Sequence, residues 1–70
     1  MTKVTCADCL AVGLCIGGQR RFLSRHGFDF RDFYDNGIEI TRFEGIEDFN
    51  LSRAIEQAKK REAEDGRRQG

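Results

Sequence analysis

The sequence predicts a single all-α domain, a compact bundle of about four short helices around a core rich in phenylalanine. The chain has 70 residues, which is too few to divide between two hydrophobic cores. Glycines recur after segments in which apolar residues are spaced three and four apart, as in short amphipathic helices. Six phenylalanines supply large apolar surfaces for the core. Only Ile38, Glu39 and Ile40 alternate as a strand would.

The first helix is expected over residues 6–12. Thr5 and Asp8 have the spacing at which a hydroxyl and a carboxylate cap the first turn of a helix, and Gly13 ends it. Its apolar side consists of Cys6, Cys9, Leu10 and Leu14.

The second helix is expected to begin near Gly17 and Gly18 and to end at His26, where Gly27 provides a left-handed cap. One stripe of this helix carries Gln19, Phe22, Leu23 and His26. The other side carries Arg20, Arg21, Ser24 and Arg25. The helix is therefore amphipathic, with a basic exposed face.

A third, short helix is expected over residues 30–35. Asp29 caps it, and Phe28 is placed to pack on Phe33 as a hydrophobic staple. Residues 41–44 have the capping-box spacing, so a single turn is expected there.

The last helix is expected over residues 48–64. Its apolar face consists of Leu51, Ala54, Ile55 and Ala58. Nearly all later residues are polar or charged, so we expect one helical domain over residues 1–60 and a disordered polar tail over residues 61–70. The predicted core is Leu10, Leu14, Ile16, Phe22, Leu23, Phe28, Phe30, Phe33, Tyr34, Ile38, Phe43, Ile46, Phe49, Leu51 and Ile55.

The charge balance of the chain indicates which kinds of partner it is not expected to attract strongly. Lys and Arg together number 12, as do Asp and Glu, so the formal net charge is zero, which argues against strong nonspecific attraction to nucleic acid or an anionic membrane. The chain has no apolar run near the roughly 20 residues that span a bilayer, and no signal peptide, so we expect a cytoplasmic protein. Forming a homo-oligomer is one way to stabilise so small a core.

No catalytic constellation is recognisable. The chain has one histidine, its few serines and threonines lie where helix caps explain them, and acidic pairs such as Asp29 and Asp32 are explained by a helix start. Cys6 and Cys9 have the spacing of a redox motif but lack the strand and helix context that such a motif needs. We therefore expect a protein that is not an enzyme.

A structural zinc site is an alternative interpretation of the three cysteines and the histidine. The set Cys6, Cys9, Cys15 and His26 has the right number and type of ligands for a structural zinc. Three cysteines also fit the reduced thiols of a cytoplasmic protein, and cysteine is often buried simply as a small apolar residue. We favour buried thiols and expect no cofactor.

The basic residues of the second helix are the candidate partner-binding surface. The proposed set is Gln19, Arg20, Arg21, Arg25 and Arg31. The first two helices around Gly13 could also form a helix-turn-helix that binds DNA, but the zero net charge makes a protein partner the first choice.

The stretch from Gly13 to Phe33, followed by Asn36, Gly37 and Ile38, resembles small, largely uncharacterised proteins encoded by tailed bacteriophages and prophages. In those proteins a Gly-x-Cys-x-x-Gly segment precedes an aromatic helix, a His-Gly step, an Asp-aromatic pair and a Gly-Ile step. The likeness extends over about residues 4–58, and Cys6 and Cys9 are not part of it. It implies a phage origin and the cytoplasm of a bacterial host, without implying an activity.

Phage genes of this size commonly encode virion morphogenesis accessories, regulators or inhibitors of host proteins. The leading hypothesis is a phage accessory protein that binds a protein partner through the basic face of its second helix, as a morphogenesis accessory or as an inhibitor of a host protein. The alternative is a helix-turn-helix DNA-binding regulator.

Overall fold

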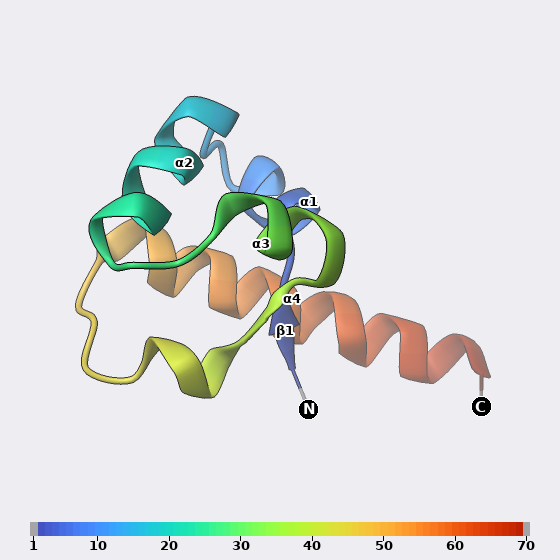
Figure 1. The fold of residues 1–70 in the computed structure, drawn as a ribbon. Helices are drawn as coiled ribbons and strands as arrows, with labels where there is room; N and C mark the ends of the chain where they lie inside the picture. The colour runs from blue at the N-terminus through green and yellow to red at the C-terminus, as the bar shows by residue number, and fades with distance from the viewer. Residues whose placement is uncertain (1, 70) are drawn as a thin grey trace.

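Helices account for most of the fold, as the sequence predicts. The computed structural model describes the backbone of residues 2–69 and the side chains of residues 2–64. Its helical segments are α1 (Cys6–Ala11), α2 (Ile16–Arg25), α3 (Phe30–Asn36), the 3-10 turn η1 (Ile40–Phe43) and α4 (Phe49–Gln69). Figure 1 shows α4 running beneath the three shorter helices and extending beyond them at its C-terminal end.

A small sheet joins the beginning of the chain to its middle. Strand β1 (Lys3–Val4) pairs antiparallel with β2 (Ile38–Glu39), so that Val4 lies opposite Ile38, and both side chains are buried. Gly37 precedes β2 with φ +73°, and a Cβ atom there would lie 3.0 Å from the carbonyl oxygen of Val4. This close approach requires glycine. The sequence indicated only the second strand.

The expected start of α1 is confirmed. Asp8 Oδ2 accepts a hydrogen bond from the Thr5 backbone N at 2.9 Å, and the Asp8 backbone N donates to Thr5 Oγ1 at 3.3 Å. The two residues thus form a reciprocal capping box. Gly13, with φ +86°, follows the helix as expected.

The other helix boundaries lie close to those expected. Helix α2 begins one residue before Gly17 and is followed by Gly27, with φ +80°. Asp29 Oδ1 accepts a hydrogen bond from the Arg31 backbone N at 3.4 Å, which caps α3. We expected Phe28 to pack on Phe33, but the ring contact of Phe28 in the structure is with Phe43, at 5.3 Å between centroids.

The core is partly as predicted and partly built from smaller residues. Of the predicted core, Leu23, Phe33, Ile38, Phe43 and Leu51 are buried. The prediction is wrong for Leu10, Ile16, Tyr34 and Phe49, which are exposed. Small residues from the expected apolar faces of the first and last helices, which the list of core residues did not include, are also buried: Cys6, Cys9, Ala54 and Ala58. The burial of Cys6 and Cys9 confirms the expected buried thiols. Small side chains let α1 and α4 approach closely.

Arg61 of α4 is bonded to the N-terminal part of the chain. Its Nε donates to Asp8 Oδ1 at 2.9 Å, and its Nη2 donates to Asp8 Oδ2 at 3.1 Å and to the carbonyl oxygen of Lys3 at 3.0 Å. Asp8 is buried, with 1% of its surface exposed. Burial alone would raise the pKa of Asp8, but the hydrogen bonds from Arg61 and Thr5 outweigh it and lower the pKa below the ordinary 3.8.

The next residue, Glu62, adds a second connection. Its carboxylate accepts hydrogen bonds from Thr2 Oγ1 at 2.9 Å and from the Lys3 backbone N at 3.2 Å. The expected tail was set to begin at residue 61, whereas Arg61 and Glu62 contact partners more than 50 residues away in the sequence, where a local pattern gives no sign of them. The backbone of α4 continues to Gln69, while the side chains of residues 65–70 lie outside the described residues.

Candidate functional site

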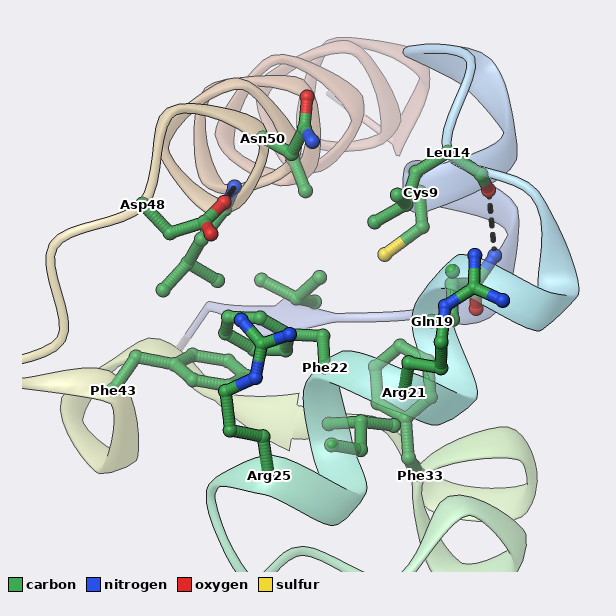
Figure 2. A pocket seen from close by; sticks show the side chains of 15 residues that line it. Cys9, Leu14, Gln19, Arg21, Phe22, Arg25, Phe33, Phe43, Asp48 and Asn50 are labelled. Carbon is green, nitrogen blue, oxygen red and sulfur yellow. Dashed lines mark hydrogen bonds between the residues drawn. The ribbon is translucent and has the colours of Figure 1, made fainter.

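A half-open cavity of about 260 Å³ lies between α2 and the beginning of α4. Its walls are mainly apolar: Cys9, Leu23, Phe33, Phe43, Leu51 and Ala54. Figure 2 shows Arg21 and Arg25 on the α2 side of this space and Asp48 and Asn50 on the α4 side. The cavity therefore combines an apolar interior with a polar rim, as small binding sites usually do.

The rim carries positive charge that nothing in the described part of the chain neutralises by direct contact. Arg21 and Arg25 are four residues apart on α2, are exposed, and form no ion pair among residues 2–64. Asp48, on the opposite side, already accepts a hydrogen bond from the Leu51 backbone N at 3.0 Å and so caps α4. The two arginines are thus placed to receive an acidic group.

Gln19 lies in the wall of the cavity rather than on the basic surface. Only 2% of its surface is exposed, so it lies apart from the exposed arginines with which it was grouped. Its Nε2 donates to the carbonyl oxygen of Leu14 at 2.9 Å (Figure 2). Its Oε1 is buried and accepts no hydrogen bond from the described residues. The apolar stripe shared with Leu23 had already placed Gln19 on the inner face of the helix.

Arg20 and Arg31, the other two expected binding residues, lie elsewhere. Both line a shallow depression that also includes Asp29 and Phe30. The Arg20 guanidinium carbon lies 4.9 Å from the centre of the Phe30 ring, in a cation–π contact. The structure therefore divides the expected basic surface in two, with only Arg21 and Arg25 at the cavity.

The four residues considered as zinc ligands do not form a cluster. Cys6 and Cys9 are buried free thiols, whereas Cys15 and His26 are exposed. No group of three or more His, Cys, Asp or Glu residues among those the structure describes is placed to hold a metal ion. Burial, together with the nearby Cys6 and Asp8, raises the pKa of the Cys9 thiol to about 12. The one thiol in the cavity wall therefore stays protonated at neutral pH and is a poor nucleophile.

No protein-family model, curated protein or solved structure matches the chain. Over the described residues, no helix is both long and apolar enough to cross a membrane.

The sequence pattern could not reveal the cavity itself. It identified Arg21 and Arg25 as exposed basic residues, but the opposite rim belongs to a helix more than 20 residues further along the chain. Asp48 and Asn50 show only the composition of a helix start. The apolar stripe of α2 was the single local signal that its inner face would meet other apolar residues.

Proposed function

We propose that this chain is a small phage-type accessory protein of the bacterial cytoplasm that acts by binding a protein partner at the cavity between α2 and α4. Arg21 and Arg25 contact acidic groups of the partner, while the apolar walls receive one of its side chains. The partner is a component of virion morphogenesis or a host protein that the accessory protein inhibits. The resemblance to small phage proteins supports the context, and the cavity supports the mode of action.

The observation that carries this proposal is the combination of an apolar cavity with two arginines at its edge that form no ion pair with the side chains of residues 2–64. Energetically important interface residues concentrate in pockets that exclude water, surrounded by a polar rim. The only thiol in the wall has a raised pKa. The arrangement is therefore suited to holding a group of the partner.

Reversing the charge of both rim arginines tests the proposal. The double substitution Arg21→Glu and Arg25→Glu is expected to weaken partner binding by about tenfold or more, because like charges facing across an interface cost several kcal/mol. The measurement is affinity capture of the tagged protein from phage-infected cells after nuclease treatment, followed by titration of the captured partner.

The matched control is Lys59→Glu with Lys60→Glu, which changes the net charge equally at two exposed positions of α4 outside the cavity wall. This control should bind as the unmodified protein does. Equal partner binding by the two double variants would show that the cavity rim is not the docking surface.

The helix-turn-helix alternative retains one favourable observation. Four residues, including Gly13 with positive φ, separate α1 from α2, and Arg20, Arg21 and Arg25 are exposed on the second of these helices. A DNA-binding protein of this kind would shift duplex DNA in a gel, and its affinity would fall steeply with added salt. The absence of a shift on phage and host DNA at low salt would eliminate this alternative.

A further inference from the structure

The size of the cavity restricts what can fill it. A cavity of about 150 Å³ lined by apolar side chains accommodates benzene, whereas sites for drug-sized molecules span roughly 300–1,000 Å³. The cavity here, at about 260 Å³, lies between the two. It therefore has room for one bicyclic aromatic group and little more.

The wall of the cavity contains one polar group without a partner. The Gln19 amide orientation is fixed, because Nε2 must be the atom that donates to the Leu14 carbonyl oxygen. This leaves Oε1 as an acceptor with no donor among the described residues and almost no accessible surface, so a donor reaches it only when the side chains over it move aside as a group enters. A buried acceptor left without a hydrogen bond is costly, so a group that enters the cavity with an N–H donor gains more than a purely apolar group.

The charge of the cavity rim determines which partner residues can lie beside the inserted side chain. Arg21 and Arg25 project from the same face of α2, one helical turn apart, and both line the cavity (Figure 2). Carboxylates beside the inserted group would meet these guanidinium groups at the edge of the apolar interior. Lysine or arginine in the same places would be repelled.

We propose that the partner inserts a tryptophan side chain, flanked by aspartate or glutamate, into the cavity between α2 and α4. The indole ring contacts Leu23, Phe43 and Leu51, and its N–H donates to Gln19 Oε1. The flanking carboxylates bind Arg21 and Arg25. This inference rests on the proposed function and specifies the chemistry of the partner segment; tryptophan is also among the residues that most often dominate binding energy at interfaces.

A short peptide tests this directly, because the protein contains no tryptophan and its single tyrosine can be left unexcited. The probe is acetyl-Asp-Glu-Trp-Glu-Asp-amide, titrated with the unmodified protein while the tryptophan emission is recorded. We expect a saturable blue shift as the ring leaves water, together with NMR shift changes at Leu23 and Leu51. No saturable shift in emission, or NMR changes confined to the Arg20 and Arg31 depression, would overturn the inference.

Three altered peptides separate the parts of the proposal without changing the protein. Naphthylalanine in place of tryptophan keeps a bicyclic ring but removes the N–H, and should bind about fivefold to tenfold more weakly, as expected for one lost hydrogen bond. Alanine in place of tryptophan should abolish binding, and lysines in place of the acidic residues should weaken it by about tenfold or more. Equal affinity for the naphthylalanine peptide would refute the contact with Gln19, and equal affinity for the lysine peptide would refute the role of the rim.

Failure of this inference is distinguishable from failure of the proposed function. Suppose that the peptides do not bind, but that the Arg21→Glu and Arg25→Glu variant fails to capture the partner. The protein then binds its partner through the rim without a tryptophan. If the acidic peptide binds in the cavity but nuclease-treated capture yields no protein that depends on these arginines, the cavity chemistry stands and the proposed function fails.

Discussion

Replacing Phe33 with alanine is expected to lower the free energy of unfolding by about 3–5 kcal/mol. Phe33 is 2% exposed and belongs to the buried core cluster. Domains of 70 residues are stabilised by roughly 4–10 kcal/mol in total, so this substitution removes a large share of the stability or unfolds the protein. Urea unfolding followed by circular dichroism measures the effect, seen as a lower midpoint at an unchanged slope.

The matched control is Phe49→Ala, the same chemical change at a side chain that is 77% exposed. It should alter the free energy of unfolding by no more than about 0.5 kcal/mol, as is usual for surface positions. Similar losses at the two positions would contradict the placement of the core.

The second large effect is expected for Arg61→Ala, which removes the partner of a buried carboxylate. We expect a loss of about 3 kcal/mol, the low end of the range for breaking a buried ion pair, because the Arg61 side chain is about one-third exposed. Asp8 keeps its hydrogen bonds from Thr5, but its remaining charge is no longer balanced. Lys60→Ala, at the neighbouring exposed position, should stay within about 0.5 kcal/mol. Equal stability of the two variants in urea would show that the ion pair contributes nothing.

The same ion pair makes stability depend on acid. Because the folded-state pKa of Asp8 lies below its ordinary value of 3.8, the stabilisation is fully present above that value and is lost as the pH falls through the folded-state pKa. Arg61→Ala should therefore flatten the acid side of the stability profile. A smaller dependence should remain from Glu62, whose pKa is lowered by hydrogen bonds from Thr2 and Lys3. An unchanged stability profile in the variant would show that Asp8 is not the source of the acid dependence.

Features decided by residues close together in the sequence were predictable. The capping pair Thr5 and Asp8, the cap Asp29 and the turn at Gly27 all depend on groups within a few residues, so their spacing alone indicates them. Gln19 was also predictable as a buried residue from its position on the apolar stripe.

Features decided by distant residues were not predictable. The ion pair of Asp8 with Arg61 joins positions 53 residues apart, and the cavity brings α2 next to the start of α4. The close contact of α1 with α4 follows from small residues such as Cys9 and Ala58, whose apolar helix faces were predictable although the helix that each face meets was not.

The bonds from Arg61 and Glu62 to the first residues of the chain also set the timing of folding during synthesis. Strand β1 and the capped start of α1 leave the ribosome nearly 60 residues before their partners on α4. The early helices can form as they emerge, but the domain cannot close until residue 62 is outside the exit tunnel. Nascent chains arrested just before and just after that point should differ sharply in resistance to protease.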